Sequence, residues 1–278
     1  MQSCLDQLGK EGPRHWFVDR IKTIKSNFSI NQLYIQFGMV KRKIPDQPLL
    51  LKPEQIYTLQ QINPAFRVDS WTLQDWCRLA LIQMIPVEQQ AEILEPLFES
   101  ADKGELIVLY RSLPFMQNQH QFIHRGSEGI RTNMIDVFDA ITAHNPFPAK
   151  HFGENAWNQL VIKSIFLERP LFTIWGLDNR HNSTLAMMAQ DFAHERWAAN
   201  RLVTPELWRL LTGFLNETNF KDIQKIITTG DELSNQAGIR IIEESDHQLA
   251  KDWLRANNIS SATMSWYDIG ISANKTNI

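Results

Sequence analysis

The chain has 278 residues, of which 43% are hydrophobic and 21% are charged, with a net charge of −3. This composition is typical of a globular protein and excludes a disordered chain. The slightly acidic balance also argues against a generic nucleic-acid-binding protein, which would carry a basic footprint.

Helical periodicity dominates the chain. In WTLQDWCRLALIQMIP (71–86), apolar residues recur at three- and four-residue intervals behind the capping-box-like pair Thr72 and Asp75. Residues 87–99, where Pro96 should kink or shorten the helix, and residues 102–113 follow after very short turns. Three short helices so connected cannot each bury a face alone and must stack. We therefore predict an all-α fold, an irregular right-handed α-α superhelix of the HEAT or armadillo type without a fixed repeat period.

The other elements are predicted from later or weaker patterns. Helices are expected near residues 14–28, 31–40, 53–62, 128–144, 154–168, 183–200, 204–216, 219–228 and 246–256. GIRIIEE (238–244) suggests a short strand, and residues 257–278 lack periodicity. We divide the chain into an N-terminal helical segment (1–62), a core array (63–216), and C-terminal helices with an irregular tail (217–278), within one continuous domain.

The compartment follows from cysteine usage and from the absence of long apolar runs. Cys4 and Cys77 form neither a disulfide framework nor a zinc site, which favours a reducing compartment. No apolar run approaches the roughly 18–20 residues that a membrane helix needs, and the N-terminus lacks an apolar signal core. We predict a cytoplasmic protein without a transmembrane segment.

Four polar residues crowd the edges of the helical pattern RTNMIDVFDAITAHNPFP: Arg131, Asn133, His144 and Asn145. Asp139 lies on the opposite side of this pattern, where solvent is expected. The four residues are interpreted either as boundary residues that cap neighbouring turns or as part of a functional cleft.

Two later helices carry polar groups among apolar ones. Asn158 lies between aliphatic residues of ENAWNQLVIKSIFLE, so its amide needs hydrogen-bond partners, which we expect in a loop near Asn145. In STLAMMAQDFAHERWAAN, Arg196 projects from the apolar face, with Glu195 at its edge and His194 pointing away. A guanidinium there needs a carboxylate or carbonyl groups, either as a structural ion pair or as an anion-binding group in a cleft.

Metal and catalytic motifs are weak or missing. Asp191 with His194 has D-x-x-H spacing and Glu244 with His247 has E-x-x-H spacing, but the predicted helices are too short for a di-metal bundle. The sequence has no G-x-S-x-G, Walker A, G-x-G-x-x-G or H-E-x-x-H pattern. We predict no metal site and no cofactor.

Three segments carry a family resemblance: residues 131–166, the stretch PLFTIWGLDNR, and AHERWAANRLVTPELWR. Over residues 66–215 the chain resembles the EboA-domain family. The resemblance implies a bacterial gene cluster for secondary metabolism, with a UbiA-type prenyltransferase among its enzymes and a link to making or moving a small metabolite. It implies no chemistry for the EboA component and no catalytic residue.

Two functional hypotheses remain open. In the first, the chain is a non-catalytic binding or scaffold protein that takes a small metabolite, or a partner protein of the same pathway, in a concave cleft. In the second, it is an enzyme of unfamiliar type, in which His144 or His194 acts as acid or base while Arg131 or Arg196 holds an anionic substrate.

Overall fold

The computed structural model describes residues 5, 7–9 and 12–275. Over these residues the chain is helical, with isolated bridges such as Pro48–Thr72 in place of a β-sheet. The predicted all-α class is confirmed. The superhelical arrangement remains a prediction.

Two compact units make up the chain, Met1–Phe152 and Gly153–Ile278, called here the N-terminal and the C-terminal unit. The N-terminal unit contains α2 (Pro13–Ser26), α3 (Ile30–Lys43), α4 (Pro53–Ile62), η1 (Val68–Ser70), α5 (Leu73–Ile82), η2 (Val87–Gln89), α6 (Gln90–Ser100), α7 (Lys103–Ser112), η3 (Leu113–Phe115), η4 (Gln119–Phe122), α8 (Ile123–Arg131), α9 (Ile135–Thr142) and α10 (Phe147–His151). The C-terminal unit contains α11 (Glu154–Phe166), η5 (Leu171–Thr173), η6 (Leu177–Asn179), α12 (Ser183–Ala198), η7 (Pro205–Leu211), α13 (Glu217–Thr229), α14 (Glu232–Glu244), α15 (Gln248–Ala256) and α16 (Trp266–Lys275). The division after Phe152 falls inside the predicted core segment 63–216, and the three-part division remains a prediction.

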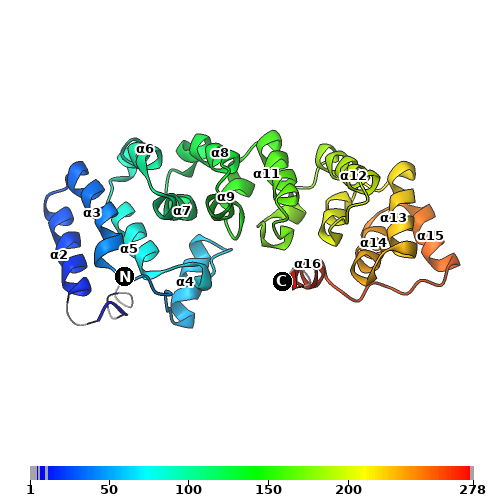
Figure 1. The fold of residues 1–278 in the computed structure, drawn as a ribbon, viewed down its shortest axis with the longest axis horizontal. Coiled ribbons are helices and arrows are strands. Elements are labelled where there is room, and N and C mark those ends of the chain that lie inside the picture. Colours follow the sequence, from blue (N-terminus) through cyan, green and yellow to red (C-terminus); the bar gives the residue numbers. More distant parts are fainter. Residues whose placement is uncertain (1–4, 6, 10–11, 276–278) are drawn as a thin grey trace. The chain divides into compact units, whose positions relative to one another are not determined.

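Short helices in the N-terminal unit pack against their neighbours in sequence, α2 on α3 and α8 on α9, and also across longer separations, α3 on α5 and α5 on α7 (Figure 1). Three of these helices, α3, α5 and α7, begin where a side chain accepts a backbone N–H. In α5, the Thr72 hydroxyl accepts the N–H of Asp75 at 3.2 Å, and the Asp75 carboxylate accepts the N–H of Thr72 at 3.0 Å. This reciprocal pair is the capping box that the sequence predicts.

Two glycines of this unit illustrate how closely the helices approach one another. A Cβ on Gly129 of α8 would lie 2.6 Å from the Tyr110 ring, whereas a Cβ on the exposed Gly38 of α3 would find its nearest neighbour, a Glu105 oxygen, at 3.7 Å. We expect Gly129→Ala to lower the free energy of unfolding by about 1–3 kcal/mol through overpacking. Gly38→Ala should raise it by about 0.5–1 kcal/mol, because alanine favours the helix. Urea unfolding followed by circular dichroism measures both, and effects of the same sign would contradict the packing argument.

The single helix predicted over 128–144 is wrong, because the chain breaks between α8 and α9. Thr132 and Met134 have extended ψ values of 149° and 105°. The Thr132 hydroxyl accepts the N–H of Met134 at 3.1 Å. The hydroxyl thus competes for a backbone donor that a continuous helix would use, and α9 starts afresh at Ile135.

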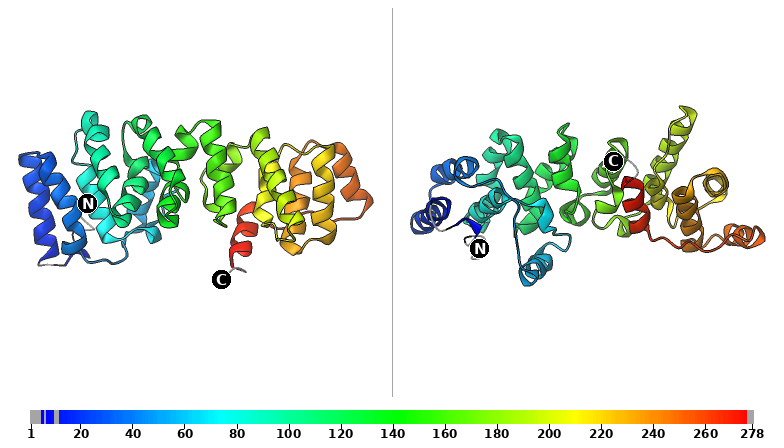
Figure 2. Two further views of the ribbon diagram at one scale, coloured as in Figure 1. Left: turned by 45° about the horizontal axis from the view of Figure 1, so that its top comes forward. Right: turned by 60° about the horizontal axis from the view of Figure 1, so that its bottom comes forward.

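In the C-terminal unit, α14 packs against both α13 and α16 (Figure 2). Two predictions are wrong here. GIRIIEE lies within α14, where Ile239, Ile241 and Ile242 are buried, so it is helical rather than a strand. The predicted irregular tail contains α16, which begins at a capping pair missed in the sequence: Asp268 accepts the N–H of Ser265 at 3.2 Å, and the Ser265 hydroxyl accepts that of Asp268 at 3.1 Å. Residues 276–278 of that tail lie outside the described part of the chain.

Candidate functional site

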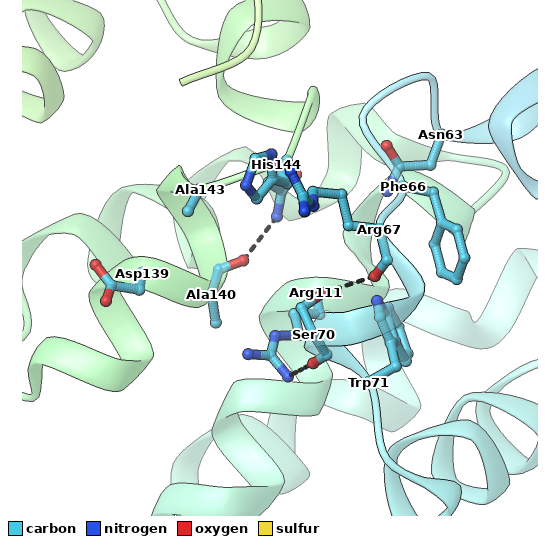
Figure 3. Close-up of a pocket in the computed structure, with 11 residues that line it drawn as sticks. Asn63, Phe66, Arg67, Ser70, Trp71, Arg111, Asp139, Ala140, Ala143 and His144 are labelled. Atoms are coloured by element: carbon cyan, nitrogen blue, oxygen red, sulfur yellow. Dashed lines mark hydrogen bonds between the residues drawn. The ribbon is translucent and has the colours of Figure 1, made fainter. Parts of the chain in front are cut away.

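A hollow opens in the N-terminal unit where the end of α9 lies beside the segment that follows α4 (Figure 3). Its volume is about 70 Å³, enough for a few water molecules or one small polar group, because one water needs about 10–15 Å³. Drug-sized ligands occupy roughly 300–1,000 Å³, so the hollow suits one end of a metabolite. Its lining residues are Asn63, Phe66, Arg67, Ser70, Trp71, Arg111, Asp139, Ala140, Ala143, His144 and Asn145.

Asn145 fixes the backbone behind the hollow. Asn145 is 3% exposed, and its amide nitrogen donates to the carbonyl oxygens of Tyr110 at 3.1 Å and Ala140 at 3.0 Å. Its amide oxygen accepts the N–H of Phe147 at 3.0 Å. Both ends of the buried amide are therefore satisfied. Asn145 joins α7, α9 and α10, which supports the interpretation of this residue as a structural cap.

His144 lies in the same turn, with a φ of 54°. This left-handed conformation is uncommon outside glycine, although histidine is among the residues enriched in it. The imidazole lies next to the Arg67 side chain (Figure 3). The ring makes no hydrogen bond with any residue in the described part of the chain. A half-buried imidazole without a polar partner is costly, so His144 marks a place where a ligand group could be received.

Electrostatics favour the neutral form of His144. Burial lowers the pKa of its imidazole below the ordinary value, and the neighbouring Arg67 guanidinium lowers that pKa further, while Asp69 acts in the opposite direction. The neutral ring has one donor and one acceptor nitrogen. It is therefore able to donate a hydrogen bond or to take up a proton.

Two arginines provide the positive charge of the hollow. Arg67 is held by the Asp69 carboxylate, with nitrogen–oxygen distances of 2.8 and 3.3 Å. Arg111 donates to the carbonyl oxygen of Ser70 and lies 3.4 Å from the Asp75 carboxylate. The guanidinium of Arg111 is largely buried, and burial lowers its pKa, but an arginine keeps its charge in proteins. Both cations are thus fixed before any ligand arrives.

The other two predicted residues of this unit lie outside the hollow. Arg131 ends α8 and pairs with Glu128 at 2.8 Å, with its side chain 67% exposed. Asn133 is exposed in the break between α8 and α9. Neither lines the hollow, so the pattern RTNMIDVFDAITAHNPFP places His144 and Asn145 at the candidate site and leaves Arg131 and Asn133 on the surface.

Asn158 of the C-terminal unit is 3% exposed and satisfies its amide within its own unit. It donates to the Asn182 amide oxygen at 3.1 Å and accepts from the Asn182 amide nitrogen at 2.8 Å. Asn182 also caps α12 by accepting the N–H of Leu185 at 2.8 Å. The predicted need for partners is confirmed, but the partner is a helix cap rather than the loop near Asn145.

The three predicted residues of α12 lie toward its exposed side. Arg196 donates from Nε to the Leu202 carbonyl oxygen at 2.9 Å and lies 3.8 Å from the Glu168 carboxylate. The guanidinium has the carbonyl and carboxylate neighbours expected of it, but its side chain is 28% exposed rather than part of the core face. Glu195 is exposed. His194 is 49% exposed and lies 2.8 Å from the Asp222 carboxylate of α13.

The His194–Asp222 pair should contribute little stability, because the His194 side chain is 49% exposed and contacts open to solvent are screened. We expect Asp222→Asn to change the free energy of unfolding by less than about 1 kcal/mol. Urea unfolding measures this change, with His194→Ala as the companion variant. A loss above about 3 kcal/mol in either variant would contradict a surface role.

The described residues contain neither a cluster of metal ligands nor a membrane-spanning helix. No group of three or more histidine, cysteine, aspartate or glutamate side chains there could hold a metal ion. Across the same residues, every helix is too short or too polar to cross a bilayer.

Sequence reasoning missed three charged residues of the hollow: Arg67, Arg111 and Asp139. Asp139 was expected to face solvent but lines the hollow, half-buried, on the other side of the view from Phe66 and Trp71 (Figure 3). Arg67 and Arg111 lie on segments far apart in the chain, and no local sequence pattern predicts that these segments pack together. The left-handed φ of His144 likewise has no signal in the sequence.

One family model, described as "Metabolite traffic protein EboA", matches residues 1–212. The chain belongs to the EboA family. No curated protein and no solved structure matches it. The matched region extends beyond the resemblance over 66–215 and contains the whole hollow. By its description, the EboA family has a role connected with metabolites, while residues 213–278 lie beyond the match.

Proposed function

We propose that this EboA-family protein binds a small polar metabolite, without transforming it, in the hollow of its N-terminal unit. The observation that carries the proposal is His144, a half-buried imidazole that makes no hydrogen bond to described residues and lies beside Arg67. The family description supports a metabolite as the ligand.

The geometry favours binding over catalysis. The enzyme hypothesis needs an acid or base together with a substrate-holding arginine, and the arginine it assigned in the N-terminal unit was Arg131. That residue is exposed, bonded to Glu128 and outside the hollow. Arg67 and Arg111 supply the charge instead, and each is held by an aspartate of the protein. Fixed groups of this kind suit recognition of a ligand.

A steric variant tests the binding site without changing any charge. Ala143 lines the hollow, and Ala143→Leu should fill the space. Ala198, exposed at the end of α12, provides the matched control Ala198→Leu. The proteins are incubated with a small-molecule extract of the source cells, freed of unbound material by gel filtration, and analysed by native and denaturing mass spectrometry.

We expect a mass excess that is lost on denaturation in the wild type and in Ala198→Leu, and that is missing in Ala143→Leu. Equal capture by Ala143→Leu would remove the hollow as the binding site. Release of a chemically altered product over time would favour the enzyme hypothesis. A wild-type protein that captures nothing would shift the function toward a scaffold for a partner protein.

A further inference from the structure

We infer that the hollow receives a carboxylate group between Arg67 and His144, and that His144 takes up a proton from solvent as the carboxylate binds. This inference rests on the proposed function and names the ligand class of the same site. It concerns one polar end of the metabolite, because the volume of about 70 Å³ holds a group of that size.

The arrangement of Arg67 and His144 points to an anion. The two side chains lie together at the hollow (Figure 3), and the guanidinium disfavours a charge on the imidazole. Two groups that repel each other when both are positive attract an anion placed between them. A planar carboxylate can accept from a guanidinium N–H and from an imidazole N–H together.

The charged groups around His144 favour a single negative charge. Arg67 and Asp69, from the segment around η1, act directly on its imidazole, while Arg111 of α7 and Asp139 of α9 line the same hollow. Arg67, Arg111 and Asp139 line the hollow, while Asp69 and Asp75 are the ion-pair partners of the two arginines. A carboxylate, with its single charge, therefore meets less repulsion from Asp139 than a doubly charged phosphate would.

The proton uptake follows from linkage. The surroundings of His144 disfavour imidazolium, because burial and Arg67 both act against the charge. A bound carboxylate adds a negative charge beside the ring and so favours imidazolium. The bound state therefore holds more protons than the free state at intermediate pH, so affinity rises as the pH falls. Each unit by which binding raises the pKa of His144 corresponds to about a tenfold difference in affinity between the two ends of the titration.

Acetate is the probe, and acetamide is its neutral counterpart of the same shape. Protein labelled at the histidine rings is titrated with pH from about 5.5 to 8, where most of the acetate is ionised, and the imidazole signals are followed by NMR at constant ionic strength. The His144 signal is assigned by its loss in His144→Asn, since asparagine also accepts a positive φ. His194→Asn is the matched control at an exposed histidine of the other unit.

We expect acetate to shift the His144 signal in a saturable way and to raise the pKa of its imidazole, whereas acetamide does neither. Arg67→Gln should weaken acetate binding at least tenfold and raise the pKa of His144 in the free protein. His194→Asn should leave both quantities unchanged. This combination would support the inference.

Two results would contradict the inference, each in a different part. Saturable acetate binding at His144 with an unchanged pKa would refute the proton uptake but leave the hollow as a binding site. No response to acetate would refute the carboxylate as ligand. The proposed function would then depend on the mass spectrometry of Ala143→Leu, which makes no assumption about ligand charge.

Discussion

Replacing Asn145 with alanine is expected to lower the free energy of unfolding of the N-terminal unit by about 2–4 kcal/mol. The amide makes three hydrogen bonds in a site that is 3% exposed. Alanine leaves the N–H of Phe147 buried without its acceptor and also removes donors to two carbonyl oxygens. An unsatisfied buried donor costs more than the net gain from an ordinary hydrogen bond.

The exposed Asn133 provides the control for this variant, because Asn133→Ala removes the same side chain from the surface 12 residues earlier. We expect that control to stay within about 0.5 kcal/mol of the wild type. Urea unfolding measures both proteins. A loss below about 1 kcal/mol for Asn145→Ala would mean that water replaces the amide, and Asn145 would then not be the anchor of the turn that presents His144.

The capping box of α5 is a part of the fold that the sequence predicts correctly. Thr72 with Asp75 forms the expected box because both partners lie within one turn of each other. The break after Arg131 was missed for a related reason: Thr132 offers its hydroxyl to the backbone, and that competition is hard to weigh against a strong apolar period.

The C-terminal helix α16 was missed because its buried stripe is weakly apolar. Trp266, Ile269, Gly270 and Ala273 are buried at helical spacing, but glycine and alanine contribute little to a hydrophobic pattern. Gly270 is needed there, since a Cβ would lie 2.7 Å from a Glu206 oxygen and from the Phe172 ring. A close approach of this kind depends on tertiary structure, and its only sign in the sequence is a glycine.

The candidate site could be predicted in part. The sequence predicts that the Asn158 amide needs partners and that Asn145 is either a boundary residue that caps a turn or part of a cleft, and both side chains are buried and hydrogen-bonded. The charges that define the hollow were not identified, because Arg67 and Arg111 are brought to the hollow by the packing of segments far apart in the chain. The isolated helix patterns contain no information about that packing.

The buried Glu206 is the second position where a large effect is expected. It is 2% exposed. Its carboxylate accepts the N–H of Leu171 at 3.1 Å, that of Phe172 at 2.6 Å, and the amide nitrogen of Asn274 at 3.2 Å. It thereby joins η5, η7 and α16 within the C-terminal unit. We expect Glu206→Ala to cost about 2–4 kcal/mol, because two backbone donors lose their acceptor.

Hydrogen exchange is the measurement suited to this variant, because it reports each unit separately. Glu206→Ala should increase exchange in α16 and around Leu171, and leave α5 of the N-terminal unit unchanged. Glu217→Ala, at an exposed first-turn glutamate of α13, is the matched control. Unchanged protection of α16 in Glu206→Ala would show that apolar packing alone holds that helix.

The pH dependence of the same carboxylate has a definite sign. Burial raises the pKa of Glu206, and the bonds from Phe172, Leu171 and Asn274 together with the charge of Arg209 oppose that effect only in part. A folded pKa above the unfolded value means that the stability contribution is fully present below the unfolded pKa, about 4.3, and is lost as the pH rises through the folded pKa. The glutamine in Glu206→Gln does not titrate. The free energy of unfolding of the wild type, relative to that of Glu206→Gln, should therefore decrease as the pH rises from about 4 toward neutrality. An increase of this relative free energy with pH would mean that the hydrogen bonds to the ionised carboxylate outweigh its desolvation. The ionised form of Glu206 would then be the form that stabilises α16.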